Sequence, residues 1–123
     1  MKQQRTGVKR LGSAIIYSLA GIRTALQNEA AFRQECVVTL ILTPAGFWLG
    51  QTATERALLI GSCWLVLVIE LMNSGLEAAV DRSGTDYDLL AGQAKDLGSA
   101  AVFVSLLLML LVWGLIGWER FGG

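Results

Sequence analysis

The fold of this chain is decided by the stretch LGSAAVFVSLLLMLLVWGLIGW, residues 97–118, which contains no charged side chain. A transmembrane helix needs about 20 mostly apolar residues, and this stretch meets that requirement by itself. Two shorter apolar runs precede it, at residues 36–50 and 57–72. Each reaches spanning length when a neighbouring mixed helical segment is added. We therefore predict an all-α membrane protein with transmembrane helices over about residues 32–50, 56–80 and 96–118.

An additional helix is predicted ahead of the first span, over about residues 8–28. Apolar side chains recur there at roughly helical spacing, with basic and polar residues between them. Such a pattern is typical of an amphipathic helix that lies on the membrane surface. All 123 residues are then expected to form a single domain.

The distribution of basic residues predicts the orientation. Six of the ten Lys and Arg precede the first apolar run at residues 36–50, so the N-terminal segment should remain in the cytoplasm. The turn at residues 51–56 then lies outside, the loop at 81–96 is cytoplasmic, and the C-terminus ends outside. Under this topology Trp48, Trp113 and Trp118 all approach the outer interface, as expected for an aromatic belt.

Composition limits the available chemistry. The chain has no histidine, so carboxylates must carry any proton transfer. Its formal net charge is zero, and the charge asymmetry is explained by membrane orientation, so no nucleic-acid partner is expected. Neither a G-x-x-x-x-G-K-[ST] loop nor a G-x-G-x-x-G loop occurs. Any ATP site must therefore differ from those of the common soluble kinases.

A polar stripe runs along the end of the second predicted span. It rises about 16 Å along one face of the helix, and the remaining faces are apolar. Its members are Glu70, Asn73, Ser74, Glu77 and Asp81. Carboxylates at this depth are costly unless they face protein, water or a cation, so they are functional candidates. The alternative is a set of interfacial carboxylates held by Arg23 or Arg33.

A second acidic group precedes the first span. Glu29 is predicted at the same depth as Glu77, and two carboxylates from separate helices suit a Mg²⁺ ion that bridges nucleotide phosphates. Alternatively, Glu29 pairs with Arg33 four residues later. Glu35 lies closer to the lipid region and is a candidate for binding a polar substrate head.

A basic and an acidic residue, Lys95 and Asp96, stand together where the third span begins. A lysine there can neutralise phosphate oxygens as a point charge. The ordinary alternative is a lysine that snorkels from a helix end to the membrane surface.

Three strings carry a family resemblance: NEAAFRQE at residues 28–35, VIELMNSGLEAAVDR at 68–82 and AKDLGSAAV at 94–102. With them the chain resembles the prokaryotic diacylglycerol kinases, small trimeric membrane enzymes. The resemblance implies phosphorylation of diacylglycerol to phosphatidic acid, with ATP as co-substrate and Mg²⁺ as cofactor. It also implies a homotrimer in the bacterial inner membrane, with the reaction at its cytoplasmic face.

The same resemblance implies residue roles. Glu70 would be the general base, with Asn73 and Lys95 as further catalytic groups, and Glu29 and Glu77 would bind Mg²⁺. Asn73, Lys95 and Asp96 would position the nucleotide. The other nucleotide contacts would be Arg10, Tyr17, Asp86, Tyr87 and Asp88. The lipid would contact Arg10, Ser18, Arg23, Arg33, Glu35, Trp48, Arg56, Glu70, Ser99 and Trp113. The chain departs from the family pattern at Leu19, Leu26, Pro44 and Asp88.

Two alternatives remain open from the sequence. In the first alternative, the phosphoryl acceptor is another lipid alcohol, such as undecaprenol. In the second, the protein is a small proton-coupled exporter with a cation-binding glutamate. An exporter usually needs that glutamate near mid-membrane, whereas Glu29, Glu77, Asp81 and Lys95 crowd the predicted cytoplasmic end of the spans. A purely structural subunit would leave the polar stripe unexplained.

Overall fold

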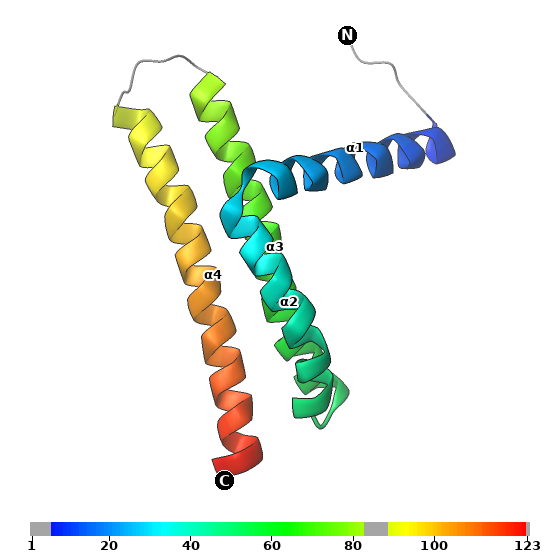
Figure 1. Cartoon of the computed structure of the whole chain (residues 1–123), viewed down its shortest axis with the longest axis vertical. Coiled ribbons are helices and arrows are strands. Elements are labelled where there is room, and N and C mark those ends of the chain that lie inside the picture. Colours follow the sequence, from blue (N-terminus) through cyan, green and yellow to red (C-terminus); the bar gives the residue numbers. More distant parts are fainter. Residues whose placement is uncertain (1–5, 83–88, 123) are drawn as a thin grey trace.

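The computed structural model describes residues 6–82 and 89–122, and this part of the chain is helical apart from short connections. Its helices are α1 (Gly7–Asn28), α2 (Ala30–Leu49), α3 (Ala53–Arg82) and α4 (Leu89–Gly122). Helices α2, α3 and α4 run side by side in alternating directions, whereas α1 leaves the bundle sideways from its joint with α2 (Figure 1). The predicted all-α architecture is confirmed.

Both connections that flank α3 are shorter than predicted. Helix α3 begins at Ala53, inside the turn predicted at residues 51–56, and α4 begins at Leu89, inside the loop predicted at 81–96. The first turns of α4 are helical because they already pack against α3: Gly92 is buried, and Lys95 bonds to Asp81 of α3. The polar composition of this segment suggested a loop, but its contacts with α3 favour helix.

Helices α3 and α4 are each long and apolar enough to cross a membrane. Helix α2 packs mainly against α3, but it carries the polar run Arg33, Gln34 and Glu35 near its start and includes Pro44. A crossing by α2 therefore stays a prediction. Large apolar side chains of the bundle are extensively exposed, among them Leu40, Val68, Phe103 and Leu110. Contiguous apolar surface of this kind needs lipid or protein to cover it.

The core is a narrow seam along one face of α3. Leu59, Cys63 and Val66 are essentially inaccessible, and their spacing of three to four residues places them on the same side of the helix. Helix α4 meets this seam with small residues, and its Trp113 Nε1 donates a hydrogen bond of 3.0 Å to the carbonyl of Leu59. The small buried residues of α4 are Gly92, Gly98 and Ser105.

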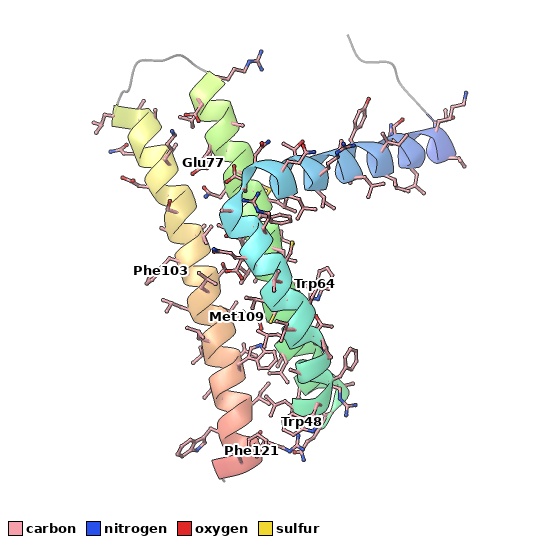
Figure 2. All side chains as sticks on the ribbon, viewed as in Figure 1. Trp48, Trp64, Glu77, Phe103, Met109 and Phe121 are labelled. Atoms are coloured by element: carbon pink, nitrogen blue, oxygen red, sulfur yellow. The ribbon has the colours of Figure 1, made fainter. Side chains whose placement is uncertain are left out.

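Two arginines join the helices at the end of the bundle where α2 stops. Arg56 of α3 donates from Nε to the carbonyls of Phe47 and Gly50, at 3.0 and 3.1 Å. Arg120 of α4 donates from Nη1 to the carbonyl of Trp48 at 3.1 Å and to that of Leu49 at 2.7 Å. Cations are favourable at a helix C-terminus, where carbonyls lack partners. Trp48 and Phe121 lie together at this end, far from Glu77 (Figure 2).

Candidate functional site

The joint between α1 and α2 is a single residue, Glu29. It ends α1 and starts α2, with an extended backbone at φ −118° and ψ 106°. Its N–H donates to the carbonyl of Ala25 at 2.9 Å, and its own carbonyl accepts from the N–H of Arg33 at 3.2 Å. Because both neighbouring helices stay hydrogen-bonded up to Glu29, the bend is sharp and the half-buried carboxylate is held at the corner.

Arg33 stabilises this corner. Its Nη1 donates to the carbonyls of Leu26 and Gln27, at 2.8 and 3.3 Å, and so caps the end of α1. Arg33 forms no ion pair with Glu29 in the described chain, so the predicted alternative of a simple i, i+4 pair is not observed. The capping role was not foreseen from the sequence, because the bend that exposes those carbonyls has no signature of its own.

Four carboxylates form what we call the acidic cluster: Glu29, Glu35, Glu70 and Glu77. Glu70 is buried on the seam of α3, with only 8% of its surface accessible. The charged groups that act on it are Glu35, then Glu29, then Glu77, and no cationic side chain of the described chain is among them. The cluster therefore gathers negative charge from α2, from the corner and from α3 around one buried carboxyl group.

The predicted Mg²⁺ site at Glu29 and Glu77 stays a prediction. Within residues 6–82 and 89–122 no three carboxylates or cysteines converge closely enough to hold a metal ion. Glu29 and Glu77 remain as a pair of half-buried carboxylates from separate segments. Mg²⁺ keeps most of its waters and commonly takes one or two carboxylates together with substrate phosphates, so the chemistry of this pair fits Mg²⁺ held jointly with a nucleotide.

Two contacts link the polar stripe of α3 to α4. Lys95 Nζ lies 2.7 Å from Asp81 Oδ1, and both side chains are partly exposed. An exposed ion pair adds little stability, so its main effect is to orient the lysine. Asn73 faces Gly98, and its Oδ1 is buried without a hydrogen-bond partner in the described chain. Asp81 belongs to the predicted stripe, but neither pairing was predicted.

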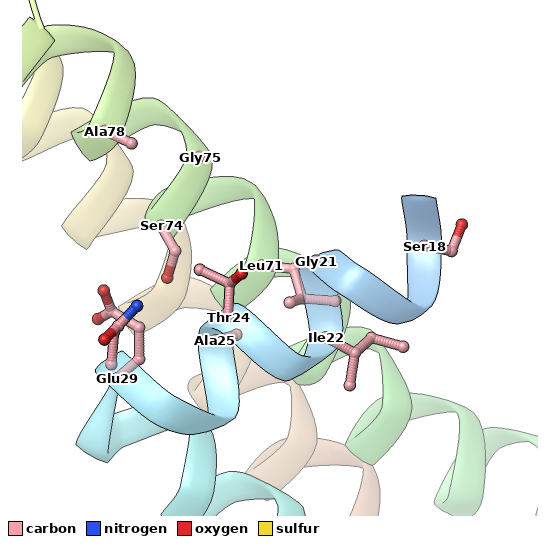
Figure 3. A pocket seen from close by; sticks show the side chains of 11 residues that line it. Ser18, Gly21, Ile22, Thr24, Ala25, Glu29, Leu71, Ser74, Gly75 and Ala78 are labelled. Carbon is pink, nitrogen blue, oxygen red and sulfur yellow. The ribbon is translucent and has the colours of Figure 1, made fainter. Parts of the chain in front are cut away.

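A groove of about 590 Å³ separates the end of α1 from α3. Its walls are mostly small or apolar, and Glu29 and Ser74 face it from opposite sides (Figure 3). Ser18 also lines the groove, while its hydroxyl donates to the carbonyl of Ala14 at 2.7 Å. The remaining lining residues are Gly21, Ile22, Thr24, Ala25, Asn28, Leu71, Gly75 and Ala78.

Other predicted site residues lie apart from the acidic cluster. Arg10 and Tyr17 are exposed on the projecting part of α1, with Arg10 about 27 Å along the helix from Asn28. Trp48, Arg56 and Trp113 contact backbone carbonyls or rings toward the other end of the bundle. Their roles stay predictions, as do those of the exposed residues Arg23, Asp96 and Ser99. Asp86, Tyr87 and Asp88 fall outside the described residues.

Comparison with known proteins agrees with the resemblance. Residues 16–117 match the prokaryotic diacylglycerol kinase family. The chain is 44% identical to the diacylglycerol kinase of Escherichia coli (strain K12), over 99% of this chain and 100% of the relative. It is 48% identical to that of Haemophilus influenzae, over 89% and 92%, and 46% identical to that of Pseudomonas aeruginosa, over 91% of each. The chain therefore belongs to the prokaryotic diacylglycerol kinases and is an enzyme of that family.

Proposed function

We propose that this membrane enzyme transfers the γ-phosphoryl group of ATP to diacylglycerol and forms phosphatidic acid, at the cytoplasmic face of the bacterial inner membrane. The observation that carries the proposal is the buried carboxyl group of Glu70 within the acidic cluster. It lies on a helix long and apolar enough to cross a membrane, and Val68, two residues earlier on that helix, is exposed. We propose that a hydroxyl presented from the bilayer reaches this carboxyl group when the substrate binds.

Glu70 is proposed as the base of the transfer. The lipid hydroxyl oxygen attacks the γ-phosphorus, the bond from that phosphorus to the β–γ bridging oxygen breaks, and ADP departs. In a loose transition state the hydroxyl proton leaves late, so a carboxylate is basic enough to accept it.

The nucleotide is proposed to bind around Glu29 and Glu77. These carboxylates would hold Mg²⁺, which supplies charge neutralisation to the phosphates. Lys95 would contact phosphate oxygens, and its contact with Asp81 limits the positions its ammonium group can take. Asn73 lies one helical turn from Glu77 and would donate to a phosphate from its amide, while Asp96 lies next to Lys95. The groove beside Glu29 suits an apolar lipid segment.

Exposed side chains at both ends of the bundle support the proposed orientation in the membrane. Helix α1 projects sideways with Leu11, Ile15 and Leu19 exposed, as suits a helix in the cytoplasmic interface. At the opposite end Trp48 and Trp118 are exposed, as suits the outer interface. This orientation gives a cytoplasmic N-terminus and an external C-terminus.

The acceptor is tested directly with purified enzyme in mixed micelles. With radiolabelled ATP, label should enter phosphatidic acid when diacylglycerol is present, because the family match favours that acceptor. Undecaprenol at the same mole fraction should accept little label. Preferential labelling of undecaprenol would make undecaprenol the substrate. A rate of ATP hydrolysis that does not change when either lipid is added, with no labelled lipid formed, would contradict the kinase reaction.

Glu29→Gln and Glu77→Gln should each raise the Mg²⁺ concentration needed for half-maximal rate and raise the KM for MgATP. Each change removes one anionic ligand from the shared ion while preserving side-chain volume. The measurement is a Mg²⁺ titration at fixed ATP, with Glu55→Gln, at the other end of α3, as the matched control. Unchanged titrations in both variants would contradict the site.

We propose that the protein is a homotrimer with active sites at subunit boundaries; the number three comes from the family resemblance. The exposed apolar faces of α2 to α4, and the distance of Arg10 and Tyr17 from the acidic cluster, support additional subunits around each site. Cross-linking in detergent should yield a limiting trimer band. A fully active preparation that cross-links only as monomer would refute the assembly.

Glu70→Gln should retain the fold and nearly normal MgATP binding but lose kcat by roughly 10²-fold or more, the usual scale for loss of a general base. A carboxylate that only stabilised packing would behave differently. Its neutralisation in an apolar setting would leave activity intact and could raise the melting temperature. Turnover and Tm measured on the same preparation separate the two roles, and a variant with wild-type kcat would end the assignment.

A further inference from the structure

We propose that Gly98 of α4 is a positioning residue for phosphoryl transfer, because its backbone Cα–H holds the Oδ1 atom of Asn73. Gly98 itself touches neither substrate. It acts by fixing the side-chain amide of Asn73 on the polar stripe, between Glu70 and Glu77. The inference rests on the role of Asn73 in the proposed function and extends it to a residue on the neighbouring helix.

The geometry at Gly98 is specific. A Cβ atom built on this residue would collide with Oδ1 of Asn73, and would lie 3.1 Å from Asn73 Cγ and 3.0 Å from Leu76 Cδ2. In glycine a hydrogen occupies the direction of that Cβ, so a Cα–H bond points at the amide oxygen. Contacts of this kind recur where helices pack closely, with carbon–oxygen separations of about 3.3–3.6 Å.

The contact from the Cα–H of Gly98 is weak, but it matters because Asn73 Oδ1 lacks a conventional hydrogen bond among the described residues. Asn73 Oδ1 is buried and has no hydrogen-bond partner in the described chain. A buried acceptor without a conventional donor is costly, so the Cα–H of Gly98 is the polarised group left to face it. Asn73 as a whole is only half-buried, although its oxygen is buried where α3 faces Gly98 of α4.

Positioning has a large effect in this type of reaction. Phosphoryl transfer depends mainly on placement and charge neutralisation, and a displacement of about 1 Å can reduce the rate about 10²-fold. A methyl group at position 98 must push the Asn73 amide away. Two other glycines on the same helix, Gly114 and Gly117, have no such partner, because a Cβ atom at either would meet nothing within 4 Å. The demand for glycine at 98 is therefore not a general property of α4.

The first test compares Gly98→Ala with the control Gly114→Ala in the mixed-micelle assay. Gly98→Ala should lower kcat/KM for MgATP about ten-fold or more, since the amide is displaced, and should leave the KM for diacylglycerol unchanged. Gly114→Ala should retain wild-type kinetics. Equal activity of the two variants, when Asn73→Ala is impaired, would overturn the inference and leave the proposed function standing.

A double-mutant cycle with Asn73→Ala then separates positioning from packing. If Gly98 acts through Asn73, Gly98→Ala should cause no further loss in the Asn73→Ala background. A loss of the same size in both backgrounds would mean that Gly98 only packs the helices, which refutes the inference. Full activity of Asn73→Ala would instead refute the nucleotide-binding role of Asn73, and the inference with it.

The cycle remains decisive if Gly98→Ala does not fold. The collision partner is the Asn73 amide, so the double variant should regain the melting temperature of Asn73→Ala alone. A double variant that stays unfolded would locate the strain in the helix–helix contact itself and overturn the inference.

Discussion

The close packing of α4 on the seam of α3 is the contact on which the rest of this structure depends. In a bilayer, apolar helices gain nothing by leaving lipid for each other, so association relies on close backbone approach and on polar contacts. Gly98 and Ser105 permit that approach, and the bond from Trp113 to the carbonyl of Leu59 fixes it further along. The same packing buries Glu70 and the oxygen of Asn73. The packing of α4 on α3 thus stabilises the bundle and also removes the polar groups of Glu70 and Asn73 from solvent.

Much of this architecture could be predicted from periodicity and composition. The uncharged run at residues 97–118 is long enough to span a membrane. The apolar residues near the N-terminus recur at helical spacing between polar ones, as in a surface helix. The stripe from Glu70 to Asp81 was visible for the same reason, because polar residues at helical spacing within apolar sequence stand out. These features are local, and a single helix determines each of them.

Contacts between helices could not be predicted in the same way. The Lys95–Asp81 bond depends on the register of α4 against α3, and the cap made by Arg33 depends on a bend at one residue, Glu29. Neither register nor bend is encoded in the period of a pattern. The lengths of the connections were missed for a related reason: residues 89–96 look like a loop in isolation and are helical because α3 lies beside them.

The distribution of charge gives the clearest link between architecture and chemistry. Arg33, Arg56 and Arg120 donate to helix-end carbonyls, and Lys95 bonds to Asp81. The three arginines join helix ends, and Asp81 orients Lys95. The charged groups that act on buried Glu70 are carboxylates. Concentrating carboxylates without internal compensation is unfavourable, so the folded chain gains from any external positive charge that enters the acidic cluster. A divalent cation held by Glu29 and Glu77, as proposed above, would bring that charge. The phosphates of a nucleotide are themselves anionic, so they would need the cation and a donor such as Lys95 to lie beside these carboxylates.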